Sequence, residues 1–440
     1  MILIYTEELT PRIEYISRLI FTTILKKEVS FTGSLSDFQK SELPRFNYSE
    51  KKLDNIPYIK PHPIMHSREL IQPDIQLVRY NGESYFFESS ANSDLPFDPL
   101  AASFYLVTRY EEYLCEKRDE HNRFPAEESI LFKHNLLKKP VVNIWANMLT
   151  ELLKKYFPEI IFPEPKFEFL STIDIDNAWA FSHKGFFRSC GALGKALLKR
   201  TFPEVKSRLK VWLKKEKDPY DTYDFIHEVF RGNEDKVLFF FLLGNYGKLD
   251  KNLSWKNRHL QELIAGISSK YSVGIHPSYY SGEKRGEDAL GREIKRLEQI
   301  TGKKIRNSRQ HFLRLSFPQT YRSLIKAEIH GDYSLGYPSH PGFRAGICTP
   351  YLFYDLKREK ETLLKIIPFQ VMDVTFQTYM KVSPDEAWNE TKNLMREVKN
   401  VGGTFAAIWH NESLNNTGKW EGFRDVFIKM NESGFKWADE

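Results

Sequence analysis

The spacing of apolar and polar residues changes about a third of the way along the chain. The first 160 residues mix short strand-like stretches, turn signals and two stretches with helical periodicity. Asn81-Gly82 favours a hairpin turn between two of the strands. This pattern predicts a smaller α+β domain over residues 1–160. The expected strands are Ile2–Tyr5, Ile75–Tyr80 and Ser84–Phe87, and the expected helices are Leu100–Cys115 and Val142–Tyr156.

A proline-rich linker, residues 157–165, precedes a regular alternation of strands and helices. Because strands that alternate with helices form parallel sheets, we expect residues 166–440 to fold as a deformed (β/α) barrel of about seven parallel strands. The expected strands are Phe167–Ile175, Val237–Leu243, Val273–His276, Ile305–Arg309, Ala327–His330, Ile366–Met372 and Thr404–Trp409. The expected helices are Tyr223–Phe230, Lys256–Lys270, Gly291–Ile300, Thr320–Lys326 and Pro384–Lys399.

Composition narrows the class of protein. A hydrophobic fraction of 41% with 14% aromatic residues is typical of a globular chain, and 440 residues exceed one ordinary core. The three cysteines lie far apart, which predicts neither a disulfide framework nor a thiolate metal site. The start of the chain lacks the pattern of a signal peptide, and no stretch approaches the ~20 apolar residues of a membrane span. We therefore expect a cytoplasmic protein.

Positive charge is concentrated in residues 184–217. This segment holds eleven lysines and arginines against two acids, a net charge of +9 in a chain whose total is +6. Val205, Leu209, Trp212 and Leu213 fall on one helical face among the basic residues. The pattern is typical of a helix at an anionic membrane surface, and also of a helix packed on its own protein. Nucleic acid is a disfavoured partner, because no nucleic-acid-binding module is recognisable.

Acidic and histidine side chains recur where the predicted strands end. Asp174 and Asp176 close the first strand, and residues two apart leave a strand on the same face. Two carboxylates this close both ionise only when a cation or hydrogen bonds compensate their charge. The carboxyl ends of barrel strands are where active sites lie, so we expect one here. His276, Arg309, His311, Asp332, Asp373 and His410 follow other predicted strands.

The motifs missing from the chain also limit its chemistry. No glycine-rich phosphate loop follows a predicted strand, which disfavours a nucleotide cofactor. No Gly-x-Ser-x-Gly sequence supports a serine hydrolase. Carboxylates and imidazoles can instead hold a divalent metal and transfer protons, as hydrolysis of an amide or ester requires.

The order of these strand-end motifs over residues 166 to about 430 resembles the polysaccharide deacetylases, also called NodB-like carbohydrate esterases. The family's Thr-Phe-Asp-Asp corresponds to Thr172-Ile173-Asp174 with Asp176 as the second acid, and its His-Ser/Thr motif to His276-Pro277-Ser278. Its Arg-x-Pro-Tyr corresponds loosely to Arg309-Gln310-His311-Phe312, and its Leu-x-x-His to Ala407-Ile408-Trp409-His410.

The resemblance implies a deformed barrel that removes acetyl groups from amino sugars of a glycan or its precursor. It implies that Asp174 is the general base and His410 the general acid. Arg309 would orient Asp174 and lower its pKa through an ion pair. Asp176 and His276 would hold a divalent metal, for which zinc is favoured.

One family ligand is missing, because the second metal histidine falls on Tyr280. A phenol titrates near ~10 and is a poor zinc ligand, while a catalytic zinc usually has three protein ligands. His311 is the ligand we expect to complete the set, and His340 is a second candidate. The alternative to an enzyme is a non-catalytic carbohydrate-binding or scaffolding protein on a decayed deacetylase barrel.

Three residues are predicted to bind substrate. Arg344 follows a glycine that permits close backbone approach, and its guanidinium can bind an acidic sugar group or an oxyanion. Trp409 and Tyr280 lie near strand ends and can contact a sugar. The alternatives are a loop salt bridge for Arg344 and core packing for the aromatic residues.

Overall fold

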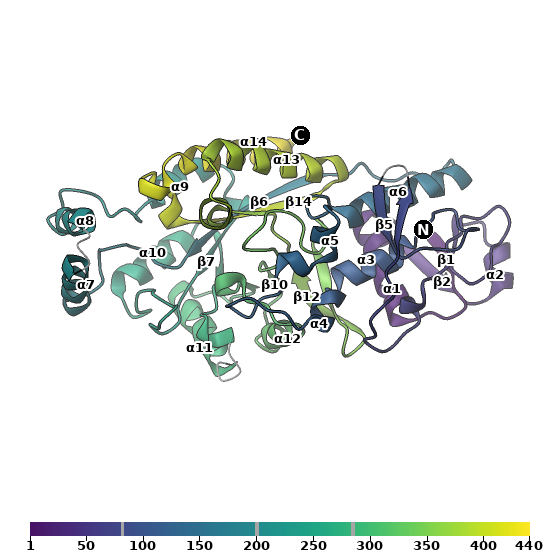
Figure 1. Cartoon of the computed structure of the whole chain (residues 1–440), viewed down its shortest axis with the longest axis horizontal. Helices are drawn as coiled ribbons and strands as arrows, with labels where there is room; N and C mark the ends of the chain where they lie inside the picture. The colour runs from purple at the N-terminus through teal and green to yellow at the C-terminus, as the bar shows by residue number, and fades with distance from the viewer. Residues whose placement is uncertain (81–82, 199–201, 283–286) are drawn as a thin grey trace.

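The computed structural model describes residues 1–80, 83–198, 202–282 and 287–440 (Figure 1). Its largest sheet has nine strands among these residues, in the order β11-β12-β10-β9-β8-β7-β6-β14-β13. Every neighbouring pair is parallel except β11 and β12. The strands are β6 (Phe167–Ile175), β7 (Val237–Phe241), β8 (Ser272–Ile275), β9 (Asn307–Ser308), β10 (Gly331–Asp332), β11 (Tyr351–Asp355), β12 (Lys360–Ile366), β13 (Val371–Met372) and β14 (Gly403–His410).

This sheet confirms the α/β class and adds β11 and most of β12, which the pattern does not predict. Two of the predicted strands also need correction. Residues 327–330 turn out of a helix instead of forming a strand, and β10 begins at Gly331. The strand expected at Ile366–Met372 is divided between β12 and β13, because Pro368 lies between them and has no backbone N–H to donate. No strand pairing within the described residues closes the sheet into a barrel.

Helices cover the sheet on both sides (Figure 1). α14 packs against β6 and α13, whereas α10 and α11 pack against β8 and α12 against β12. α13 begins at a capping box in which Ser383 and Glu386 exchange side-chain and backbone hydrogen bonds. The helices are α9 (Tyr223–Phe230), α10 (Arg258–Ser268), α11 (Glu287–Thr301), α12 (Gln319–Lys326), α13 (Pro384–Val401) and α14 (Phe423–Asp439).

Residues 1–156 contain a second, smaller sheet in which β1 pairs in parallel with β2 and β3. β4 and β5 pair antiparallel, and the turn predicted at Asn81-Gly82 lies outside the described residues. The strands are β1 (Ile2–Tyr5), β2 (Val29–Thr32), β3 (Arg45–Asn47), β4 (Leu77–Tyr80) and β5 (Glu83–Phe86). The helices are α1 (Pro11–Ser17), α2 (Leu35–Lys40), α3 (Pro99–Val107), α4 (Tyr110–Leu114), α5 (Ile130–Lys133) and α6 (Val141–Tyr156).

This N-terminal segment packs directly on the large sheet, and one continuous apolar core runs through both. The ring of Tyr15 in α1 lies 4.8 Å from that of Tyr354 in β11. Arg344 donates to both carboxylate oxygens of Glu112, at 2.9 and 2.7 Å, and all of these groups are buried. In the part of the chain that the structure describes, no helix has the length and apolar character to cross a membrane.

Candidate functional site

Strand register brings the predicted catalytic residues together at one edge of the sheet. Asp174 and His410 are direct partners in the parallel pairing of β6 with β14. Asp176 follows β6, and its Oδ2 lies 4.0 Å from Nε2 of His410. His276 follows β8, and its Nε2 lies 3.9 Å from Oδ2 of Asp174. Parallel strands end at the same edge, which is why residues far apart in sequence meet here.

Asp174 and Arg309 form a buried ion pair. Nη1 of Arg309 donates to Oδ1 of Asp174 at 2.9 Å, and both side chains are almost fully buried. Arg309 also donates to Oγ1 of Thr172 and to the carbonyl oxygen of Tyr333, which fixes the plane of the guanidinium. The pair therefore holds a carboxylate in one orientation at the end of β6.

Asp176, His276 and His311 form a candidate metal centre. Each offers one ligand atom, and these three atoms lie within 4.8 Å of one another. Nε2 of His276 lies 3.2 Å from Oδ1 of Asp176, and Nε2 of His311 lies 3.4 Å from Oδ2. Two imidazoles and one carboxylate form a donor set found in catalytic zinc sites. Among the described residues, this is the group of acids, histidines and cysteines whose geometry could hold an ion.

The hydrogen bonds of the two histidines orient them for this role. Nδ1 of His276 faces the carbonyl oxygen of Arg309, which can only accept, so Nδ1 carries the proton and donates. Nδ1 of His311 hydrogen-bonds to Oδ1 of Asp250 at 2.9 Å. Metal-binding histidines are oriented in this way, since a donor at Nδ1 leaves the Nε2 lone pair for the ion.

Asp176 supports the fit independently, because its Oδ1 is buried and has no hydrogen-bond partner among the described residues. Burial alone would raise the pKa of Asp176, but His311 and His276 hold it well below its usual range. Burial would lower the pKa of His311, but Asp176 and Asp250 raise it to about 9. A cation at Nε2 competes with that proton, so the residues fit a divalent metal whose binding releases protons.

His410 is paired with Asp373, which follows β13. Asp373 is fully buried and accepts from Nδ1 and from the backbone N–H of His410, both at 2.8 Å. Burial lowers the pKa of His410, but Asp373, followed by Asp176 and Asp174, raises it to about 10. His410 is therefore protonated at neutral pH, and its Nε2 faces the two aspartates.

These groups line a cavity of about 200 Å³. Its lining combines the candidate metal ligands with Asp174, His410 and a mainly apolar wall. The remaining lining residues are Arg123, Gln310, Phe312, Leu313, Pro338, Met372, Val374 and Tyr379.

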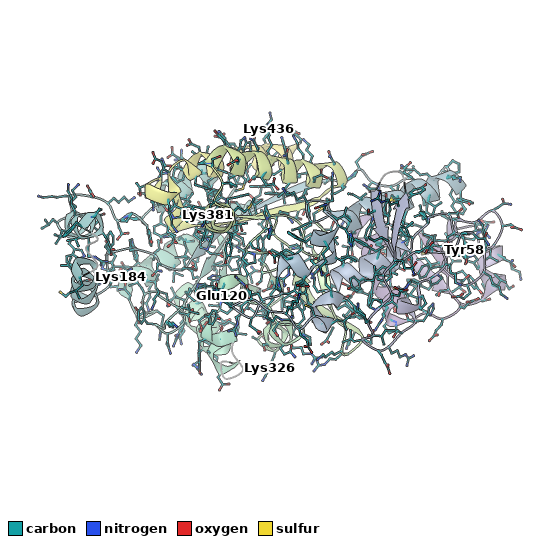
Figure 2. The ribbon with its side chains drawn as sticks, viewed as in Figure 1. Tyr58, Glu120, Lys184, Lys326, Lys381 and Lys436 are labelled. Carbon is teal, nitrogen blue, oxygen red and sulfur yellow. The ribbon has the colours of Figure 1, made fainter. Side chains whose placement is uncertain are left out.

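Arg123 is contributed by the N-terminal segment. It donates to the carbonyl oxygen of Phe312 at 2.9 Å and to the hydroxyl of Tyr379 at 3.3 Å. In Figure 2 the neighbouring Glu120 lies in the middle of the molecule, whereas Tyr58 of the same segment lies near one end. The loop around Arg123 thus leaves the rest of the N-terminal segment and reaches the cavity.

The three predicted substrate-binding residues lie elsewhere. Arg344 is buried in its ion pair with Glu112, which does not agree with binding a ligand. Trp409 is buried against Phe427 of α14, because alternate residues of β14 face opposite sides and His410 faces the cavity. Tyr280 is half exposed and lines a neighbouring cavity of about 450 Å³.

The structure also separates His340 from the candidate metal centre and adds two residues that sequence patterns missed. His340 hydrogen-bonds to Ser339 and packs on Phe132. Asp250 is nine residues beyond the end of β7, in a loop without a recognisable motif. Arg123 lies in a region with no catalytic pattern. Only the three-dimensional contacts identify Asp250 and Arg123.

Comparisons with known proteins match residues 2–158 to a family of unknown function, DUF7033. A search of curated proteins found no significant match. Among solved structures, a Mycobacterium smegmatis protein assigned to the polysaccharide deacetylases has 14% identity and a TM-score of 0.39, covering 62% of this chain and 86% of its own. An allantoinase has 12% identity and a TM-score of 0.40, covering 62% and 85%. A mutant of a CE4 family pseudoenzyme has 13% identity and a TM-score of 0.30, covering 62% and 65%. These similarities assign no role to individual residues.

Proposed function

We propose that this protein is a divalent-metal-dependent hydrolase that removes acetyl groups from amino sugars of a glycan or glycan precursor. The observation that carries the proposal is the convergence of Asp176, His276 and His311 between two pairs suited to proton transfer. Those pairs are Asp174 with Arg309 and His410 with Asp373. The order of the strand-end motifs adds the deacetylase chemistry to this arrangement.

Asp176, His276 and His311 would hold the ion. When bound, a divalent metal such as zinc would make a water more acidic and would polarise a carbonyl. In this proposal His311 takes the place of the ligand that Tyr280 cannot provide. The two imidazoles reach the cavity from different strand ends, β8 and β9, and each is oriented by a partner at Nδ1.

Asp174 would act as the general base and His410 as the general acid. Asp174, oriented by its ion pair with Arg309, accepts a proton as a water oxygen bonds to the acetyl carbon. The carbon–nitrogen bond then breaks, and protonated His410 gives its Nε2 proton to the leaving nitrogen. Asp373 holds the imidazolium by its opposite edge, so that Nε2 stays directed into the cavity. The products are acetate and a free amino sugar.

Metal analysis of the purified protein and acetate release from a panel of N-acetylated oligosaccharides test this proposal. We expect stoichiometric zinc, cobalt or nickel in the wild-type protein, and its loss in the variants His276→Ala and His311→Ala. His340→Ala is the matched control, because His340 is a loop histidine outside the cluster.

Two results would contradict the proposal. A protein that binds no metal and releases no acetate would favour the non-catalytic carbohydrate-binding alternative. A protein that binds metal through these residues but releases no acetate from any of the substrates would not be a deacetylase of this kind.

A further inference from the structure

Helices α7 (Phe186–Leu198) and α8 (Phe202–Trp212) form a hairpin inserted between β6 and α9. Figure 1 shows both helices standing away from the large sheet, at the end opposite the N-terminal segment. The base of the insertion is closed by Asp218, whose carboxylate accepts from the backbone N–H groups of Ala180, Phe181 and Ser182. The hairpin therefore protrudes from the fold, and the segments that precede and follow it lie side by side at Asp218.

The described residues of α8 present their apolar side to solvent. Arg208 and Val211 are the buried residues of this helix, and the guanidinium of Arg208 lies 4.5 Å above the ring of Phe181. Leu209 is 42% exposed and Phe202 62% exposed. A helix that packs on its own protein buries its apolar stripe, so α8 has the opposite orientation.

The apolar exposure continues at both ends of α8. Leu213, directly after the helix, is 65% exposed, and Leu198, the last residue of α7, is 87% exposed. Trp212 is also partly exposed. Large apolar side chains that gather on one protrusion mark an interaction surface, whereas single exposed ones need no explanation.

Basic side chains surround this apolar surface. Lys206, Lys214 and Lys215 are exposed, and no described acid lies within ion-pair distance of them. Lys210 is paired with Glu216, and Lys199 and Arg200 lie outside the described residues. Residues 184–217 carry a net charge of +9, which leaves −3 for the rest of the chain. The net positive charge of the sequence thus lies in residues 184–217, which contain the hairpin.

We propose that the α7–α8 hairpin docks on the surface of an anionic lipid bilayer. Leucine, phenylalanine and tryptophan side chains enter the boundary between headgroups and acyl chains, while lysines contact anionic headgroups. A protein partner explains the composition less well, since lysine is depleted in protein–protein interfaces. This inference is independent of the hydrolase proposal, because no residue of the cavity takes part.

Co-sedimentation of the full chain with vesicles tests the inference. We expect binding to vesicles of phosphatidylcholine with phosphatidylglycerol, weaker binding at high salt, and little binding to phosphatidylcholine alone. The triple variant Lys206→Glu, Lys214→Glu, Lys215→Glu should bind at least about 100-fold more weakly, from the known contribution of each basic residue near an anionic surface. Leu209→Ser with Leu213→Ser should also weaken binding, and both variants should keep the wild-type melting temperature.

The matched control reverses three exposed lysines on other faces, Lys326, Lys381 and Lys436 (Figure 2). We expect it to bind vesicles nearly as well as the wild type. The inference is overturned if the wild type does not bind anionic vesicles, or if the control loses binding as much as the hairpin variants. It is also overturned if ultracentrifugation shows self-association that Leu209→Ser with Leu213→Ser abolishes, because a second copy is then the partner. Metal content, measured in parallel, reports on the cavity separately.

Discussion

Arg123 donates a hydrogen bond from Nη1 to the carbonyl oxygen of Phe312, although 189 positions separate the two residues. Phe312 follows His311 and has a φ of 59°, and Leu313 has a φ of 53°. Two successive left-handed residues that are not glycine are costly and persist only where surrounding contacts hold them. His121 adds a ring contact to Phe312 at 4.6 Å. The N-terminal segment thus supports the turn that positions His311.

The variant Arg123→Ala should bind zinc about tenfold more weakly than the wild type, as expected for loss of a group that positions a ligand. Removing the guanidinium releases the carbonyl of Phe312 and lets the strained turn relax, which moves His311. Competition with a chromophoric chelator measures the affinity. Arg118→Ala is the matched control, because Arg118 is exposed and donates to the nearby carbonyl oxygens of Glu112, Cys115 and Lys117. Unchanged affinity in Arg123→Ala would show that the turn holds its shape without this contact.

The variant Asp250→Asn should weaken zinc binding by about 10–100-fold. The amide keeps the size of the carboxylate but loses the charge that strengthens the hydrogen bond with Nδ1 of His311. Isothermal titration with zinc measures the change, and Asp235→Asn, before β7, is the control. An affinity equal to that of the wild type would argue against His311 as a ligand.

The sequence predicts the strand-end residues of the site because local patterns determine them. The apolar run of β6 predicts that Asp174 and Asp176 lie at the carboxyl end of that strand. The apolar run of β14 likewise predicts that His410 lies at the carboxyl end of its strand. The pattern does not predict a strand over residues 360–365, because β12 begins with exposed polar residues and its Leu363 is 89% exposed, so no regular alternation marks it. A local pattern therefore places a residue at a strand end, provided that the strand itself is recognised.

The remaining roles depend on contacts between distant residues. Glu112 forms a buried ion pair with Arg344, which is 232 positions away in the sequence. Asp250 forms a hydrogen bond with His311, which is 61 positions away. Nothing in the neighbouring sequence indicates either partner. Trp409 is different, because the two-residue period of β14 already places it on the face opposite His410. Its burial could have been inferred once His410 was assigned to the cavity.

His410 and Asp373 should act as one unit in acetate release. Either His410→Ala or Asp373→Ala should lower kcat by about 10²–10⁴-fold, the usual contribution of a positioned acid, and the double variant should be no slower than His410→Ala. Asp385→Ala, on the exposed first turn of α13, is the control. Additive losses in the double variant would mean that Asp373 acts independently of His410.

Asp332 should make the protein less stable as the pH rises. Burial raises the pKa of Asp332 from 3.8 to about 7, although its carboxylate accepts hydrogen bonds from the hydroxyl and the backbone N–H of Ser334 at 2.9 and 3.0 Å. Between these two values the folded state keeps a proton that the unfolded state loses, so stability falls from about pH 4 to pH 7.

The variant Asp332→Asn should lack this slope, because its amide does not titrate. Relative to the wild type, it should gain about 3 kcal/mol of stability between pH 5 and pH 8, as measured by chemical denaturation. Parallel pH profiles for the two proteins would show that Asp332 titrates normally in the folded state.

Substitution by alanine should lower the stability of the protein at Gly434 and raise it at Gly266. A Cβ on Gly434 of α14 would lie 2.3 Å from the ring of Phe169 in β6, and that ring is confined by Phe405 and Phe435. Gly434→Ala should therefore cost about 1–3 kcal/mol through overpacking. A Cβ on Gly266 of α10 meets no atom within 4 Å, so Gly266→Ala should stabilise the helix by about 0.5–1 kcal/mol. Denaturation midpoints measure both, and a stabilised Gly434→Ala would show that α14 can move away from β6 at little cost.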